Sequence, residues 1–169
     1  MRRVWNTTSR RIGSSLLVVM LTLIGLASPA AAANQVPFTA IGTAVITGVT
    51  HLPGGLTQLD GSLSGKATHL GNVTGSITRI QDHQGGFTST AVLVGANGTD
   101  SVVLSISGRF EGGKGNSCVL TSTGTYTVSG GTGAFANATG SGTITTEIDE
   151  CAGTATGTYT GTISQPNSG

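Results

Sequence analysis

The chain has 169 residues, 28 of them glycine, and only 9% of its side chains are charged. Its 8 basic and 7 acidic side chains give a formal net charge of +1 at pH 7. Proteins that bind DNA, RNA or anionic lipid through charge present many more cations on one surface, so we expect no nucleic-acid partner and no electrostatic attachment to lipid.

Residues 1–33 have the organisation of a secretory signal peptide. Four arginines precede the apolar run at 16–26, and Pro29 and several alanines up to Ala33 follow it. The run is too short for a membrane-spanning helix, which needs roughly 20 residues, whereas small residues of the A-x-A kind are typical of a cleavage site. We therefore predict a secreted, extracytoplasmic protein that is cleaved near Ala33 and keeps no stable membrane span.

Residues 34–169 are predicted to form a single domain, in which four basic and seven acidic side chains leave a net charge of −3. Apolar side chains recur at every second position, which is the pattern of a β-strand with one face toward a core. The pattern can be followed through eight segments: 36–47, 57–68, 72–81, 87–95, 101–110, 120–128, 139–148 and 154–163. Between the fourth and the fifth, Asn97-Gly98 is a strong hairpin signal.

The two faces of the last three segments differ in composition. Threonine and serine occupy almost every position of one face, where the β-branch of threonine fits the pleated strand and its hydroxyl stays in water. The other face mixes glycine with large residues such as Tyr126 and Tyr159, as expected where strands bend around a small barrel interior. We predict an all-β fold, an eight-stranded antiparallel β-barrel, with a flattened β-sandwich as the alternative.

Cys118 and Cys151 are the only cysteines, and both lie in the part that is predicted to be exported. They are symmetric about the turn near 131–137, so antiparallel pairing of the strands on either side brings them together. An even number of cysteines in an oxidising compartment is typical of a disulfide. We therefore predict a structural bridge. A catalytic thiol or a metal site is the alternative, and no His–Cys cluster supports either.

The turn between the sixth and seventh segments is rich in glycine and contains one aromatic residue, which is typical of a tight corner with an aromatic plug. Residues 130–135 read GGTGAF and are followed by Ala138-Thr139-Gly140. This stretch resembles the GGTG-x-F-x-x-A-x-G signature of dirigent proteins and allene oxide cyclases, and is closer still to small secreted bacterial proteins of that barrel type. The resemblance implies an eight-stranded barrel with an apolar central cavity and a homo-oligomer as one possible assembly. It assigns no catalytic residue, because the catalytic residues of those families cannot be matched to positions here.

The candidates for ligand binding are His69, Arg79, Tyr126, Glu150 and Tyr159. His69 and Arg79 share the parity of inward residues, although a hydrogen-bonded strand end for His69 and a rim position for Arg79 are the simpler interpretations. A buried Arg79 would need a carboxylate partner, because an unpaired buried charge is very costly. Glu150 is expected at a barrel mouth or on a solvated strand end, and a Ca²⁺ site with Glu147 and Asp149 is a further alternative.

Known catalytic motifs are absent from the sequence. The glycines at 131–133 precede a predicted strand instead of the helix of a dinucleotide site, no G-x-S-x-G nucleophile elbow occurs, and the three histidines are too far apart for a local metal motif. We predict no catalytic residue, metal or cofactor. Three functions remain: an exported barrel that binds a small apolar ligand or associates with the cell surface, a cyclase- or isomerase-like enzyme with a central cavity, and an interaction or adhesion module that uses the threonine faces.

Overall fold

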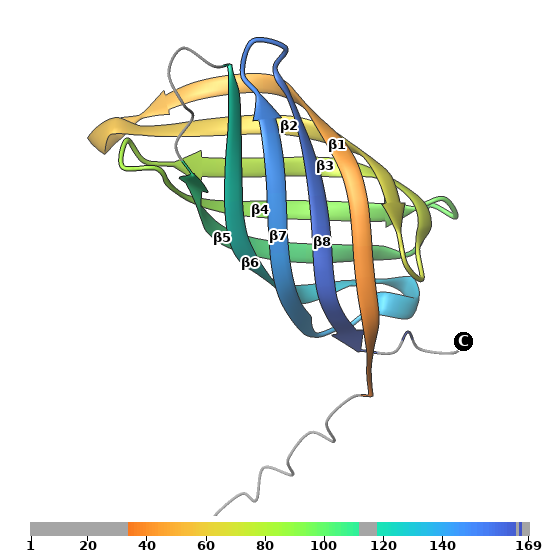
Figure 1. Cartoon of the computed structure of the whole chain (residues 1–169). Coiled ribbons are helices and arrows are strands. Elements are labelled where there is room, and N and C mark those ends of the chain that lie inside the picture. Colours follow the sequence, from red (N-terminus) through yellow and green to blue (C-terminus); the bar gives the residue numbers. More distant parts are fainter. Residues whose placement is uncertain (1–33, 112–117, 165, 167–169) are drawn as a thin grey trace, which may run out of the picture. The chain divides into compact units, whose positions relative to one another are not determined.

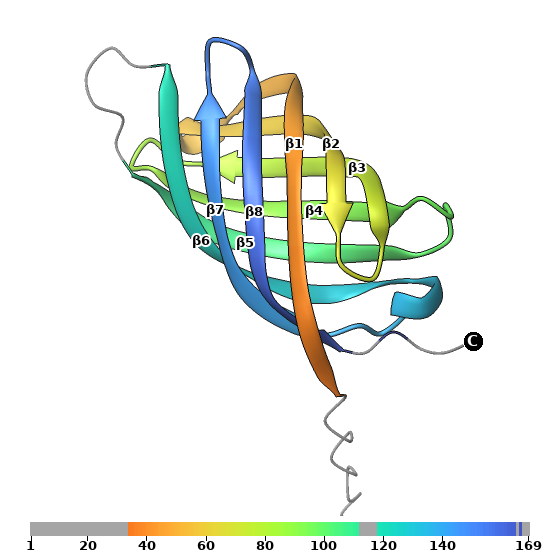
Figure 2. The same ribbon diagram turned by 45° about the vertical axis from the view of Figure 1, so that its right-hand side comes forward.

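The computed structural model describes residues 34–111, 118–164 and 166. Eight antiparallel strands form a closed barrel in which β8 pairs back with β1 (Figure 1). The strands are β1 (Gln35–Leu52), β2 (Leu56–Ala67), β3 (Gly71–Gln81), β4 (Gly86–Gly95), β5 (Ser101–Glu111), β6 (Val119–Thr132), β7 (Gly140–Asp149) and β8 (Thr154–Ser164). Two short 3-10 turns follow β1 and β6: η1 (Pro53–Gly55) and η2 (Gly133–Phe135). The predicted barrel is confirmed over the flattened sandwich, since β1 lies between β8 and β2 (Figure 2).

The signal peptide predicted for residues 1–33 lies outside the described residues. Among the residues that the structure describes, no helix is long and apolar enough to cross a bilayer.

The eight predicted segments match the eight strands, and the largest difference is at the end of β1. The predicted segment ends at 47, whereas β1 continues to Leu52. A β-bulge between Ile46 and Gly48 interrupts the register with β2, after which Val49 pairs with Leu59. A bulge inserts one extra residue, so the alternation of inner and outer side chains shifts at that point. The sequence pattern therefore ends before the strand does.

Alternation along the strands separates an apolar inner face from a hydroxyl-rich outer face. Tyr126 and Tyr159 are buried, whereas the threonines of β6 and β8 are exposed almost throughout. This confirms the orientation that the sequence predicts for these strands. The buried apolar side chains form one core cluster, whose largest members include Phe38, Leu104, Tyr126, Phe135 and Ile163.

Three large aromatic residues of the core, Phe38, Tyr126 and Phe135, fill the half of the barrel where β1, β3, β5 and β7 begin, which we call the closed half. Phe38 is completely buried, and its ring meets that of Tyr126 edge to face with the centroids 6.1 Å apart. Tyr126 meets Tyr159 in the same way at 5.8 Å. Gly142 and Gly161 lie beneath the Tyr126 ring, where a Cβ atom would come within 2.7 and 2.6 Å of it. These glycines therefore make room for the ring.

The corner at η2 seals the closed half. Phe135 is buried there, as the predicted aromatic plug requires. The carboxylate of Asp100 accepts hydrogen bonds from the main-chain N–H of Ala134 at 2.9 Å and from the side-chain amide of Asn97 at 2.8 Å. These two hydrogen bonds hold the pKa of Asp100 below its usual range. Gly133 has a φ of +60°, a left-handed conformation that favours glycine.

A disulfide ties the other end of the barrel, where β1, β3, β5 and β7 end, which we call the open half. It joins Cys118, before β6, to Cys151, after β7, with the Cα atoms 5.5 Å apart. The main-chain N–H of Glu150 donates to the carbonyl of Cys118 at 2.8 Å. The predicted bridge is confirmed, and closing a loop of this length stabilises a fold by roughly 3–4 kcal/mol in the chain-entropy model. Disulfides are typical of proteins in oxidising, extracytoplasmic compartments.

Candidate ligand-binding cavity

The open half contains a cavity of about 240 Å³. Its apolar wall is formed mainly by Ala44, Ile46, Leu59, Ile77, Phe110, Ile148 and Ala155. Ala44 and Ala155 pair directly across β1 and β8, so two methyl groups stand side by side on this part of the wall. Eight-stranded barrels either fill their interior with side chains or hold one small ligand. Small residues on adjoining strands leave this half unfilled.

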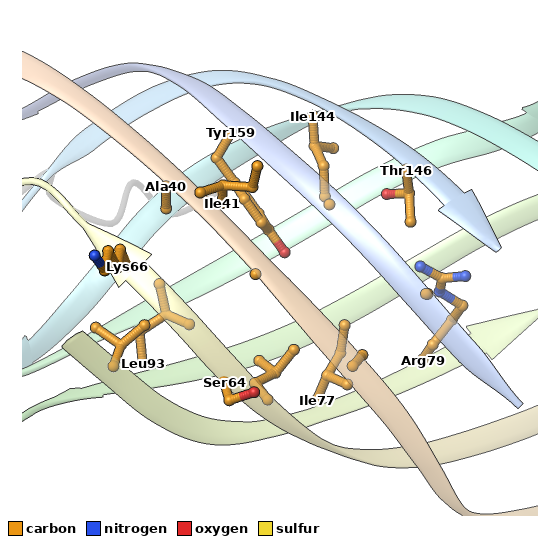
Figure 3. Close-up of a pocket in the computed structure, with 16 residues that line it drawn as sticks. Ala40, Ile41, Ser64, Lys66, Ile77, Arg79, Leu93, Ile144, Thr146 and Tyr159 are labelled. Carbon is orange, nitrogen blue, oxygen red and sulfur yellow. The ribbon is translucent and has the colours of Figure 1, made fainter.

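A smaller cavity of about 40 Å³ adjoins the first. The two share the lining residues Ala44, Ile77, Arg79 and Ala155. Tyr159 and Thr146 belong to the smaller one, and Figure 3 shows the Arg79 side chain extending toward Thr146. Three residues labelled in the same view have exposed side chains on the outer faces of β1 and β2: Ile41, Ser64 and Lys66.

Arg79 brings a positive charge into this apolar space. It lies on the inner face of β3, as its parity predicts, and its guanidinium carbon is 4.5 Å from the ring centroid of Phe87 and 5.6 Å from that of Phe110. Its Nε–H donates to the hydroxyl of Ser89 at 3.4 Å, on the paired position of β4. Burial lowers the pKa of Arg79. The ring faces stabilise the cation, an interaction that strengthens when the charge is desolvated.

The carboxylate partner expected for a buried Arg79 is absent. All seven acidic side chains lie in the described part of the chain, and none of them forms an ion pair with Arg79 there. Asp60 and Glu150 border the larger cavity, but the Asp60 carboxylate accepts hydrogen bonds from Gln58 and Thr78 at 2.9 and 2.8 Å. Arg79 is half-buried, so the condition under which a carboxylate was expected is not met, and two aromatic rings contact its guanidinium instead.

Tyr159 adds a neutral hydroxyl to the smaller cavity. Burial raises the pKa of its phenol to about 12, and the positive charge of Arg79 offsets part of that rise. The phenol therefore stays protonated at neutral pH and can donate a hydrogen bond. In Figure 3 its hydroxyl points into the space that these residues surround.

Two buried hydroxyl groups beside the cavity have no hydrogen-bond partner among the described residues. They belong to Ser122, which is 1% exposed, and Thr146, which is 5% exposed. The two residues pair across β6 and β7, and Ser122 also pairs with Phe110 of β5. A buried polar group without a partner costs roughly 1–3 kcal/mol, so it calls for an explanation. Of the two, Thr146 lines the smaller cavity, so its hydroxyl lies next to the space that a ligand would occupy.

The structure brings together only some of the predicted site residues. Arg79 and Tyr159 line the smaller cavity, and Glu150 is exposed and borders the larger one. Tyr126 is buried in the closed half, next to Tyr159. His69 lies apart, in the turn between β2 and β3, with its ring Nε2 3.1 Å from a main-chain carbonyl oxygen of β1. This is the hydrogen-bonded strand end that was the simpler interpretation.

Four residues of the site were missed from the sequence: Phe87, Phe110, Ser122 and Thr146. The two hydroxyl residues did give a signal, because Ser122 and Thr146 are polar residues at positions with the parity of the buried side chains. The two phenylalanines gave none. They lie on β4 and β5, the next two strands along the sheet from β3, and alternation along one strand does not encode contacts between strands.

Neither a metal cluster nor a comparison with known proteins defines the ligand. In the described ranges, no three His, Cys, Asp or Glu side chains gather into a group that could hold a metal ion. Comparison of the chain with protein-family models, with curated proteins and with solved structures gives no match. What the cavity binds therefore has to follow from its own residues.

Proposed function

We propose that this chain is an exported, non-catalytic binding protein that holds a small, largely apolar molecule in the open half of its barrel. The observation that carries this proposal is the cavity of about 240 Å³ with an apolar wall. Small-molecule sites are typically concave, mostly apolar and equipped with a few convergent polar groups. Arg79 borders this cavity, and Tyr159 and Thr146 line the smaller cavity that adjoins it.

Two further features support the proposal. The signal-peptide pattern of residues 1–33 and the Cys118–Cys151 disulfide both favour an extracytoplasmic location. The corner motif at 130–140 resembles that of dirigent proteins and allene oxide cyclases, in which the barrel encloses an apolar cavity.

Binding is tested on the full chain by native mass spectrometry and thermal shift with a panel of small aliphatic, aromatic and phenolic compounds. We expect at least one compound to bind one-to-one and to raise the melting temperature. Ala155→Leu fills the cavity and should abolish binding. Thr156→Leu, which changes the exposed neighbour on the outer face, should keep it. A wild-type protein that takes up no compound, or a filled variant that binds as well as the wild type, would contradict the proposal.

A cyclase- or isomerase-like enzyme is the second candidate, and Tyr159 favours it. A neutral phenol beside a cation in an apolar cavity can donate a hydrogen bond to a reactive oxygen atom of a substrate. Chromatography of the compound recovered after incubation separates the two functions. Unchanged compound supports binding alone, whereas an isomer that Tyr159→Phe no longer produces supports catalysis.

A further inference from the structure

We propose that the bound molecule is a small apolar monocarboxylate whose carboxylate binds Arg79 inside the open half. This inference rests on the proposed binding function and narrows its ligand to one chemical class. Arg79 lines both cavities, and among the described residues no carboxylate pairs with its positive charge. A ligand with a negatively charged group would supply the missing partner of the guanidinium.

The hydrogen-bond donors of Arg79 point to a carboxylate in particular. A guanidinium has five N–H donors in one plane, and within the described part of the chain only Nε–H has a protein acceptor, at the long distance of 3.4 Å. The contacts with Phe87 and Phe110 use the ring faces, which cannot accept hydrogen bonds in the guanidinium plane as an oxygen does. The planar edge of a guanidinium matches the two oxygens of a carboxylate.

The neighbouring hydroxyls suit the same ligand. Thr146 lines the smaller cavity with Arg79 and Tyr159, and Ser122 is paired beside Thr146. The hydroxyl of Thr146 lacks a partner among the described residues and can donate to an anionic oxygen. Tyr159 remains protonated because its pKa is raised to about 12. One carboxylate can therefore satisfy a cation and both hydroxyl donors together.

The rest of the cavity limits the ligand to a small molecule with a single charge. The apolar body would lie in the larger cavity, against Leu59, Ile148 and Ala155. The larger cavity has a volume of about 240 Å³, which is below the roughly 300–1,000 Å³ that is usual for pockets that hold drug-sized ligands. A long lipid chain therefore does not fit inside it. A second negative charge would remain unpaired in an apolar environment, which disfavours phosphate monoesters and dicarboxylates.

The decisive experiment compares matched pairs of ligands on the full chain by isothermal titration calorimetry. The pairs are octanoate with octanol and cinnamate with cinnamyl alcohol, which differ in the head group and share the apolar body. We expect the carboxylate of at least one pair to bind about tenfold or more tightly than its alcohol, the size of effect that one charge-assisted hydrogen-bond pair provides.

Variants assign the preference to Arg79. Arg79→Met should remove the preference, so that the carboxylate binds no more tightly than its alcohol. Arg109→Met is the matched control, because Arg109 is exposed on β5 and donates to the Gln84 carbonyl at 3.0 Å; it should bind both ligands as the wild type does. Thr146→Val should weaken carboxylate binding by a smaller factor.

The two proposals fail in different ways. If the carboxylate and the alcohol bind equally well, or if Arg79→Met keeps the preference, the carboxylate inference is overturned and the apolar binding function stands. If no member of either pair binds the wild type, the binding function is overturned for these ligands and the inference with it. Alcohol binding also reports that Arg79→Met is folded; if that variant does not fold, Arg79→Gln, with a neutral planar end group, takes its place.

Discussion

The closed and open halves of the barrel are made by the same eight strands and differ in what their inner faces carry. In the closed half, Phe38, Tyr126 and Phe135 fill the interior, and glycines beneath the Tyr126 ring make room for it. In the open half, Ala44 and Ala155 leave a cavity of about 240 Å³. A filled interior and an unfilled interior are thus separated along one barrel.

Buried polar groups occur in both halves: the closed half holds Ser101, Ser164 and the Tyr126 hydroxyl, which has no partner among the described residues. The open half holds Arg79 together with the buried hydroxyl residues Ser89, Ser122 and Thr146. A desolvated charge and buried hydroxyls without hydrogen-bond partners lower the stability of the fold unless a ligand or water pairs with them. The well-packed aromatic core at the opposite end allows the molecule to tolerate that cost. The comparison teaches that the size of inner residues, and not a change of backbone, creates the site.

The strongest way to break this comparison is to remove one aromatic ring from each half. Phe38→Ala deletes a completely buried ring in the closed half and should lower the free energy of unfolding by about 3–5 kcal/mol, the range for large-to-small core substitutions. Phe110→Ala deletes a half-buried ring at the cavity and should cost about 1–2 kcal/mol. Urea unfolding followed by circular dichroism measures both.

Each variant is the control for the other, because both change phenylalanine to alanine on an inner face of the barrel. The expected result is a clear gap between the two costs. Equal costs would mean that the open half is as tightly packed as the closed half, which contradicts the division.

The sequence predicts most of this fold, because the alternation of side chains is local and the pairing of neighbouring strands is simple. It predicts that Tyr126 and Tyr159 face inward and that Cys118 and Cys151 meet. It fails at the end of β1, where the bulge between Ile46 and Gly48 shifts the alternation. A bulge is one inserted residue, and no composition signal marks it.

The site could be predicted only in part. Parity alone places Arg79 inside, and Ser122 and Thr146 were readable as polar residues at inner positions. The rings beside Arg79 come from β4 and β5, the next strands along the sheet, and their contact depends on side-chain direction across strands. Whether Ala44 and Ala155 leave a cavity also depends on the size and direction of side chains across the interior. Neither fact is contained in the alternation along one strand.

Tyr159 lies between the two halves. The pH dependence of stability at alkaline pH tests whether its phenol is buried in the folded protein. Burial raises the pKa of its phenol from the usual value of 10.0 to about 12 in the folded protein. A raised pKa stabilises the fold fully below pH 10 and loses that contribution as the pH approaches 12, because the unfolded phenol ionises first. Between pH 9 and pH 11 we expect a loss of about 1–1.5 kcal/mol that Tyr159→Phe does not show.

Urea unfolding at both pH values measures this difference, and the absorbance of tyrosinate gives an independent readout. A wild type whose alkaline loss equals that of Tyr159→Phe would mean that the phenol is solvated in the folded protein. The boundary between the filled and the unfilled interior would then lie deeper than Tyr159.

The smallest effect, and the one that tests the cavity most directly, comes from a single oxygen atom. Thr146→Val keeps the β-branched shape and removes a buried hydroxyl that has no partner among the described residues. Because an unsatisfied buried hydroxyl is costly, the ligand-free variant should be more stable than the wild type by about 1 kcal/mol. Thr145→Val makes the same change at the exposed neighbour on β7 and should stay within about 0.5 kcal/mol of the wild type. A Thr146→Val protein that is less stable than the wild type would show that the Thr146 hydroxyl is hydrogen-bonded in the unliganded barrel. The hydroxyl would then not be available to bind a ligand. A stabilised variant that also binds carboxylates more weakly would show that the open half gives up stability for binding.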